Sequence, residues 1–368
     1  MRIDDIDALL ATVQFSSLNQ AAEYLGITQS AITRRLQRLE QELNVTLLER
    51  QTRPLTLTAA GHRVYEQCLS IKRETKKLYS LLDPEGEPRG IVQIEHGIAE
   101  HIERYDDFAR FLADNGFIVV GDDHIGHGKS IDNGGEQGFF AESDGWDYVV
   151  WDIDRLHDIM HEKYPDLPYI FFGHSMGSFL VRTYIIRHPE KPDAVIISGT
   201  GHQPLPMVLG GLAMASAAVK LYGAHKIGDT LNSVAFGSYN KGYANPRTDF
   251  DWLSRDTENV DKYIADPLCG FVPTVSLFRD MMSGIKFVTN QANIDKMSKE
   301  TPVYFMSGDA DPVGENGKGV TRAYNAFCKA GLHDVKMRLY PAGRHELLNE
   351  INRADVYKDI LDWINEKI

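Results

Sequence analysis

Cysteine is scarce in this sequence of 368 residues, which contains only Cys68, Cys269 and Cys328. Their odd number, wide separation and lack of a C-x-x-C pattern argue against a disulfide framework and a cysteine-bound zinc ion. The N-terminus MRIDDIDALL does not resemble a secretory leader, because it places three acidic residues among its first seven. The most apolar run, Met207–Val219, is shorter than the ~20 residues that cross a bilayer. We therefore predict a cytoplasmic protein with no membrane span.

Positive charge is scarce through most of the chain. Residues 83–368 contain 28 Lys and Arg against 43 Asp and Glu, whereas residues 1–82 contain 11 against 9. The longer part would repel a phosphate backbone, and only the shorter part could approach one. This asymmetry predicts different partners for the two parts of the chain.

A break in the pattern lies between these parts. The segment 83–90, DPEGEPRG, combines proline, glycine and acidic residues, and it favours neither helix nor strand. A chain of this length can form two or three domains. We predict one domain at residues 1–82, a linker at 83–90 and a second domain at 91–368.

The first domain begins with three helical patterns. Ser17 precedes Gln20 by three residues, as in a capping box, and Gly26 is placed to end the second helix. Thr28 can cap the third helix, whose inner side carries Ile32, Leu36 and Leu39. The other side of the third helix is polar and basic, with Gln29, Ser30, Thr33, Arg34, Arg35 and Arg38. Two helices joined by a tight turn, the second one basic outside, predict a helix-turn-helix that enters the major groove of DNA.

Two short strands and a long helix follow. Val45–Arg50 and Arg53–Thr58 alternate Leu with Thr, and the loop between them makes this a winged variant. From Ala59 a helix is predicted to about Leu82. Its apolar positions follow a heptad spacing over Val64, Cys68, Ile71, Thr75, Leu78 and Leu82. Such a seam predicts pairing with a second copy of the chain.

The run LNQAAEYLGITQSAITRRLQRLEQELNVTLLER, followed by RPLTLTAAG, resembles the DNA-binding domain of LysR-type transcriptional regulators. The resemblance covers residues 1–82 and implies a dimer that binds double-stranded promoter DNA through residues 1–60. By position it implies that Gln29, Ser30, Thr33 and Arg34, with Arg35 beside them, face the groove, and that Arg53 belongs to the wing. The alternative is a three-helix bundle whose basic side is only solvated.

Apolar runs alternate with helical patterns after residue 90. The predicted strands are Ile91–Ile94, Phe117–Val120, Tyr169–Phe172, Ala194–Ile197, Val303–Met306 and Val335–Tyr340. The helices predicted between them include Tyr105–Asn115, Trp146–Tyr164, Ser178–Arg187 and Thr321–Ala330. Near-continuous apolar strands alternating with helices predict a mostly parallel sheet that is covered on both faces.

A G-x-S-x-G motif carries the main chemical prediction. Gly173-His174-Ser175-Met176-Gly177 directly follows a predicted strand and precedes a helix, which is the context of a nucleophilic serine in α/β hydrolases. The glycines allow the tight turn, and the serine then lies at a helix N-terminus that favours negative charge. The alternative is a glycine-rich turn whose serine has no function.

A serine nucleophile needs a base, and the base needs an acid that orients it. His345 follows the last predicted strand, and Asp311 follows the strand before it, with Asp309 as the second choice for the acid. The chain order Ser, Asp, His is the order that this fold uses. The backbone amides of Ile98, after the first strand, and Met176, after the serine, are the expected oxyanion donors.

Five ordered segments carry a second resemblance, namely IVQIEHGIAEHIERYDDFARFL, GDDHIGHGKS, GHSMGSFL, SGDADPVG and GRHELLNE. They are similar to the monoacylglycerol lipase/lysophospholipase group of α/β hydrolases, which is serine aminopeptidase S33-like, over residues 88–368. The resemblance implies hydrolysis of small acyl esters or lysolipids without metal or cofactor. By position it matches the triad to Ser175, Asp311 and His345 and the oxyanion donors to Ile98 and Met176.

The resemblance also implies a helical cap, and it shows that two strands of the family are missing from this sequence. Residues of about 201–293 interrupt the alternation of strands and helices. The resemblance implies that they form an apolar helical cap, which can bind an acyl chain, pack on the sheet, or do both. Before Ile91 the family has two further strands, and no strand-like sequence stands there. We therefore predict an α/β hydrolase fold without its first two strands, whose open sheet edge could pair with another chain.

Three functions follow from these patterns. The first is a serine esterase that carries a LysR-type DNA-binding domain. The second is a transcriptional regulator that uses the hydrolase fold as a ligand sensor. The third is a non-functional gene fusion, in which a hydrolase that lacks its first two strands is joined to a DNA-binding domain that lacks its effector domain.

Overall fold

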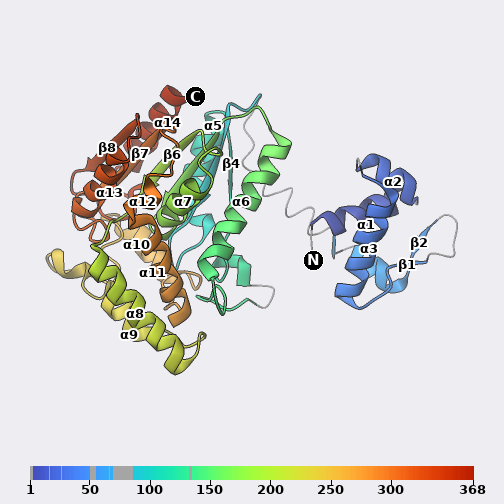
Figure 1. Cartoon of the computed structure of the whole chain (residues 1–368), viewed down its shortest axis with the longest axis horizontal. Helices are drawn as coiled ribbons and strands as arrows, with labels where there is room; N and C mark the ends of the chain where they lie inside the picture. Colours follow the sequence, from blue (N-terminus) through green and yellow to red (C-terminus); the bar gives the residue numbers. More distant parts are fainter. Residues whose placement is uncertain are drawn as a thin grey trace. The chain divides into compact units, whose positions relative to one another are not determined.

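Two units make up the chain, Met1–Leu81 and Leu82–Ile368 (Figure 1). The structure is a computed structural model. It describes residues 3–15, 17–25, 27–49, 55–65, 67–68, 86–131 and 135–368.

The first unit is built on three helices and a two-stranded ribbon. These are α1 (Ile3–Phe15), α2 (Leu18–Tyr24), α3 (Gln29–Leu43), β1 (Leu48–Glu49) and β2 (Thr56–Leu57). The strands pair antiparallel, with Leu48 opposite Leu57. Thr28 caps α3 by accepting a hydrogen bond from the amide of Ala31, as its place before the helix predicts. The winged helix-turn-helix prediction is thus confirmed, while Gly26 and the wing loop at 50–54 lie outside the described residues.

The predicted dimer seam needs a correction at its N-terminal end. Cys68 is buried in the apolar core of the first unit, and Val64 packs against the same core. Both side chains are therefore covered by the helices of their own chain, because the helix that begins after β2 lies against the three-helix core. Ile71, Leu78 and Leu82 lie outside the described residues, so the seam stays a prediction at those positions.

The second unit contains a sheet of six parallel strands. They are β3 (Gly90–Glu95), β4 (Phe117–Gly121), β5 (Tyr169–His174), β6 (Ala194–Ser198), β7 (Val303–Gly308) and β8 (Val335–Tyr340). Their order across the sheet is β4-β3-β5-β6-β7-β8, and every neighbouring pair is parallel. All six predicted strands are confirmed. No strand precedes β3 in the described residues 86–89, so β4 stands at the edge of the sheet.

Helices cover both faces of this sheet, which explains why its central strands are mainly apolar. The helices that follow the strands are α5 (Asp106–Asp114), α6 (Gly145–Lys163), α7 (Met176–Arg187), α13 (Lys318–Lys329) and α14 (Arg353–Lys367). Apolar side chains of α5 and α14 share one core with alternate residues of the strands. On the other face Phe171 packs on Tyr184 of α7, and Phe305 packs on Phe327 of α13.

The segment between β6 and β7 forms the predicted helical cap. It contains α8 (Leu205–Tyr222), α9 (Asp229–Phe236), α10 (Thr257–Ala265), α11 (Val275–Thr289) and α12 (Gln291–Ile294). Four short 3₁₀ segments complete the unit: η1 (Ile102–Tyr105), η2 (Gly128–Ile131), η3 (Tyr239–Gly242) and η4 (Leu347–Asn349). Figure 1 shows α8 and α9 together at one end of the unit.

Helix α8 extends beyond the apolar run Met207–Val219 at both ends. It has 18 residues and, by length and composition alone, is the one helix among the described residues that could cross a membrane. It packs along α11 and exposes Leu209, Leu221 and Tyr222.

Candidate active site

Ser175 stands on a sharp turn between β5 and α7. Its backbone angles, φ 52° and ψ −118°, lie in a region that residues with a side chain rarely adopt. The neighbouring glycines make this turn possible. A Cβ atom on Gly177 would stand 2.0 Å from the carbonyl oxygen of Glu95, and one on Gly173 would stand 2.5 Å from that of Gly177. The strained turn lifts the serine out of the sheet at the start of α7.

His345 and Asp311 come together at the same edge of the sheet. Asp311 follows β7, His345 follows β8, and the Nδ1 atom of His345 lies 3.1 and 3.0 Å from the two carboxylate oxygens of Asp311. Asp311 is fully buried and also accepts hydrogen bonds from the Ser307 hydroxyl and the Val313 amide. Asp309, the second choice, is exposed and accepts a hydrogen bond from the amide of Ala342. The structure therefore brings Asp311, and not Asp309, to the histidine.

The carboxylate also sets the protonation of His345. Burial lowers the pKa of His345, but the charge and hydrogen bond of Asp311 outweigh burial, so the pKa lies above its ordinary value of 6.5. The ring of His174 is 4.6 Å away, and burial lowers the pKa of His174 to about 4. His345 is therefore the ring of this pair that takes up a proton more readily.

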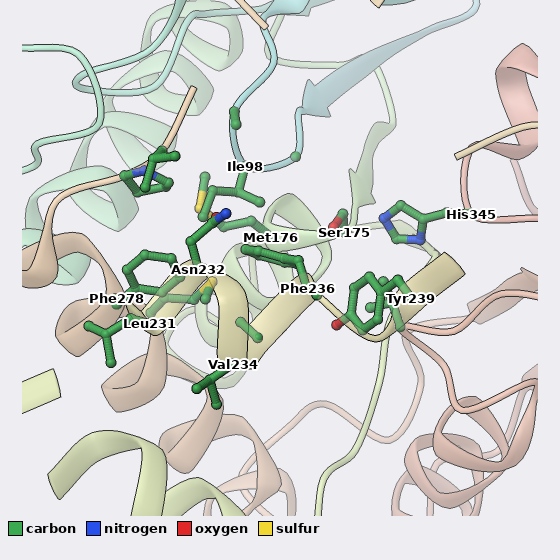
Figure 2. A pocket seen from close by; sticks show the side chains of 18 of the residues that line it. Ile98, Ser175, Met176, Leu231, Asn232, Val234, Phe236, Tyr239, Phe278 and His345 are labelled. Carbon is green, nitrogen blue, oxygen red and sulfur yellow. The ribbon is translucent and has the colours of Figure 1, made fainter. Parts of the chain in front are cut away.

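The loop after β3 passes close to the serine. A Cβ atom on Gly97 would lie 2.5 Å from Oε1 of Glu100 and 3.1 Å from the Cβ atom of Ser175, so a side chain there would displace at least the Glu100 carboxylate. Ile98, the next residue, lines the same pocket as Ser175, Met176 and His345. Four of the five residues predicted for the site thus line one pocket, with Ile98 and Met176 beside the serine (Figure 2), and Asp311 joins them through its bond to His345.

A buried ionic network that the sequence did not reveal supports this loop. Arg104 donates hydrogen bonds of 2.6 Å to Glu100 and to both carboxylate oxygens of Glu346, the residue after His345. Glu100 in turn accepts a hydrogen bond of 2.6 Å from the amide of Gly97. Burial raises the pKa of Glu346, but Arg104 outweighs burial and lowers it to about 2. The network therefore connects the Gly97 loop to the His345 loop and fixes the position of each relative to the other.

The cap covers the site with apolar side chains. The pocket has a volume of about 940 Å³ and contains Ser175 and His345 together with side chains of α8, α9 and α11. In Figure 2, Phe236 and Tyr239 lie close to these two residues, while Leu231, Val234 and Phe278 lie farther along the pocket. The ring of Trp252 lies against the ring of His345, tilted by 39° with 5.1 Å between the centroids. The arrangement offers a polar end for an ester group and an apolar end for a chain.

Three clusters among the described residues could hold a metal ion: His101, Asp266 and Cys269; Glu95, Asp122 and His124; and Asp154, His157 and Asp158. In the first cluster His101 already bonds Asp266 at 2.8 Å. In the third, Lys191 pairs with both aspartates. The second cluster, of which Glu95 and His124 are buried, has no lysine or arginine paired with its carboxylates in the part of the chain that the structure describes.

The predicted DNA-contacting residues lie on α3 in the first unit. Gln29, Ser30 and Arg34 are exposed, while Thr33 and Arg35 are half-buried. Arg53 lies outside the described residues. Arg38, which the sequence placed on the same basic side, donates to both carboxylate oxygens of the buried Asp5 and so joins α3 to α1.

The parallel sheet, the turn at Ser175 and the covering cap define an α/β hydrolase. A family model described as serine aminopeptidase, S33, matches residues 86–352, and the chain belongs to this family. A monoacylglycerol lipase of Mycolicibacterium smegmatis is 29% identical over 292 residues, covering 78% of this chain and 92% of that protein. A solved carboxyl esterase of Bacillus coagulans, in complex with glycerol, is 31% identical with a TM-score of 0.73, covering 77% of this chain and 92% of that one.

The first unit has relatives of another kind. A model of the bacterial regulatory helix-turn-helix proteins of the lysR family matches residues 3–62. An uncharacterized HTH-type transcriptional regulator of Escherichia coli is 38% identical over 93 residues, covering 25% of this chain and 29% of that protein. The chain therefore joins a LysR-type DNA-binding domain to a monoacylglycerol lipase-like hydrolase domain.

Proposed function

We propose that this protein is a cytoplasmic serine esterase that cleaves monoacylglycerols or lysolipids and binds double-stranded DNA through its first unit. Ser175 is the nucleophile, His345 the base and Asp311 the acid that orients the base. The observation that carries the proposal is the bond of 3.0 Å between His345 and a buried Asp311, in the pocket that also contains Ser175. The relatives with lipase and esterase names support the same reaction.

The reaction follows from these positions. His345 takes the proton of the Ser175 hydroxyl while Oγ of Ser175 attacks the carbonyl carbon of the ester. The charge of Asp311 stabilises the imidazolium that forms on His345. The carbonyl oxygen becomes an oxyanion, which accepts hydrogen bonds from the amides of Ile98 and Met176. His345 then gives its proton to the departing alcohol, which leaves an acyl-serine. Water, activated by the same histidine, releases the acid and restores the serine.

The pocket favours a substrate with one acyl chain. The apolar side chains of α8, α9 and α11 extend from the serine, and burying each CH₂ group contributes about 0.8 kcal/mol. A glycerol ester places its alcohol at the polar end and its chain along this lining.

A chain-length series tests this proposal. The purified full-length protein is assayed on monoacylglycerols and on p-nitrophenyl esters of increasing acyl length. We expect turnover of both classes, with KM falling as the chain grows until the pocket is filled. Absence of turnover of every ester, in protein whose circular dichroism shows a folded state, would overturn the esterase proposal.

The pH dependence of the reaction reports on His345. The base must be neutral to accept the serine proton, and its pKa is raised above 6.5 because Asp311 outweighs burial. We therefore expect kcat/KM to rise with pH through a midpoint above 6.5. The measurement is the pH profile of kcat/KM on a neutral ester. A wild-type midpoint below 6.5 would contradict the assignment.

The exposed side of α3 supports binding of DNA in the major groove. Arg34 is exposed near the start of α3, where its Nε donates to the carbonyl of Ser30 and its guanidinium can still reach DNA. Arg34→Ala should weaken binding to the gene's own upstream DNA about 10- to 100-fold, with a shallower dependence on salt. Gel-shift titration at two salt concentrations measures both effects.

A matched control for this measurement lies in the hydrolase unit. Arg110 of α5 is also an exposed helical arginine, and among the described residues it pairs only with Asp106 in its own helix turn. Arg110→Ala should leave DNA affinity unchanged. Equal losses for both variants would mean that general positive charge, rather than α3, binds the DNA.

A further inference from the structure

The buried cluster of Glu95, Asp122 and His124 lies where two neighbouring strands end. Glu95 is the last residue of β3, and Asp122 and His124 follow the end of β4. The two strands are paired in parallel, with Ile94 opposite Gly121, so their carboxyl ends meet at one edge of the sheet. β4 is the edge strand of this sheet, and these three residues stand at its C-terminal end.

Two carboxylate oxygens in this cluster have no hydrogen-bond partner among the described residues. The side chain of Glu95 is fully buried; its Oε1 accepts a hydrogen bond of 2.8 Å from Gln93, but its Oε2 has no donor. Oδ1 of Asp122 is likewise buried without a donor. Leaving buried carboxylate oxygens unsatisfied is costly, so either a proton or a cation is expected at this point.

The histidine presents a lone pair to the same point. Nε2 of His124 lies 3.2 Å from the carbonyl oxygen of His96, and because a carbonyl can only accept, Nε2 carries the proton. Nδ1 is then unprotonated and faces Oε2 of Glu95 across 3.8 Å, which is too long for a hydrogen bond. A metal-bound imidazole commonly donates its other N–H group to a carbonyl in this way.

We propose that Glu95, Asp122 and His124 bind a divalent transition-metal ion, with Zn²⁺ the ion that fits best. The candidate ligand atoms of the three residues lie within 4.8 Å of one another. Zn²⁺ bonds nitrogen and oxygen at ~2.0–2.2 Å, so two such bonds span up to ~4.4 Å. The gap of 3.8 Å between Glu95 and His124 fits this span, and a small shift of the partly buried Asp122 closes the rest. Ca²⁺ and Mg²⁺ prefer six or more oxygen ligands and fit less well.

The ion would cross-link two strands at the edge of the sheet and stabilise the Gly97 loop at the active site. It joins the end of edge strand β4 to the end of β3. This edge is open because the two further strands that the family has before Ile91 are lacking in the described residues. His124 also contacts His96 twice, because its amide donates to Nε2 of His96 and its ring donates to the His96 carbonyl. His96 is followed by Gly97 and Ile98. The three ligands are thus positioning residues, and none of them lines the pocket.

The test measures metal binding directly in the full-length protein. The protein is stripped with EDTA, incubated with Zn²⁺, desalted and analysed for metal content and for Tm. We expect one tightly held Zn²⁺ per chain and a Tm that rises with Zn²⁺. Glu95→Gln and Asp122→Asn should each weaken binding at least about tenfold and remove the Tm rise. Co²⁺ in place of Zn²⁺ should give visible absorption that both variants lose.

Matched controls separate this cluster from the two others. Asp266→Asn and Asp158→Asn change one carboxylate in each of the other clusters and should retain Zn²⁺ like the wild type. Loss of Zn²⁺ in a control but not in Glu95→Gln would overturn the proposal. It would also be overturned if the wild type retained no metal, since a proton on Glu95 would then balance the charge. If Glu95→Gln fails to fold, Asp122→Asn, at a position less buried than Glu95, decides the result.

Discussion

Ser175→Ala is expected to abolish ester hydrolysis, with kcat falling about 10⁶-fold on every ester that the wild type cleaves. The variant removes the only oxygen that can form the acyl-enzyme, while His345 and Asp311 keep their bond. The remaining rate would come from the oxyanion amides and from binding, which by themselves accelerate hydrolysis by about 10³–10⁴ over water. Because alanine keeps the Cβ atom and hence the same strained turn, the substitution should leave the free energy of unfolding nearly unchanged.

Ser298→Ala is the matched control for this substitution. Ser298 lies outside the pocket, where its hydroxyl accepts a hydrogen bond from the amide of Glu300. It should keep wild-type kcat and KM. A Ser175→Ala protein with more than a few per cent of the wild-type rate, purified free of host esterases, would show that another group attacks the ester.

The strands were the most predictable part of the fold because their signal is local. A strand buried on both faces must be apolar along its whole length, and β5, with Ile170, Phe171 and Phe172, meets that requirement within a few residues. The turn at Ser175 is equally local, since its glycines are required by contacts with the backbone next to them. Both features could be predicted from one short segment of sequence.

Pairings between distant segments were not predictable in the same way. Arg38 seemed one more basic residue on α3, and only the packing of α1 brings the buried Asp5 to it. Cys68 fitted a heptad seam by its spacing, yet the core of the first unit covers it, because spacing identifies an apolar side of a helix without naming what covers that side. The contact of Arg104 with Glu346 joins residues 242 positions apart.

Signals for two of the missed features do exist in the sequence. Glu100 and Arg104 stand four residues apart beside the Gly97 loop, which is the spacing of a helical ion pair. Glu95 is an acid at the end of a fully buried strand whose other polar side chain is Gln93, and a buried charge there requires a partner. A charged residue inside an apolar pattern therefore indicates by itself that a functional or structural contact satisfies the charge.

Asp311→Asn is expected to lower kcat about 10⁴-fold while KM changes little, as loss of the acid does in triads of this type. The amide cannot stabilise the imidazolium, and it can hold His345 in the wrong tautomer by donating to Nδ1. Since the carboxylate is what raises the pKa of His345 above 6.5, the midpoint of kcat/KM against pH should also move downward in the variant. Steady-state kinetics on one neutral ester, repeated across pH, measures both effects.

Asp309→Asn is the control, and the comparison decides between the two acids that the sequence left open. Asp309 is exposed and bonds only the amide of Ala342 among the described residues, so its variant should keep kcat within about twofold of the wild type and keep the same pH midpoint. Asp311 is fully buried and bonds both the histidine and the loop around it, so some loss of Tm accompanies the loss of rate. The pH midpoint separates the two causes, because a loosened loop lowers the rate without moving the pKa of His345. A large loss of kcat in Asp309→Asn, with Asp311→Asn close to wild type, would exchange their roles.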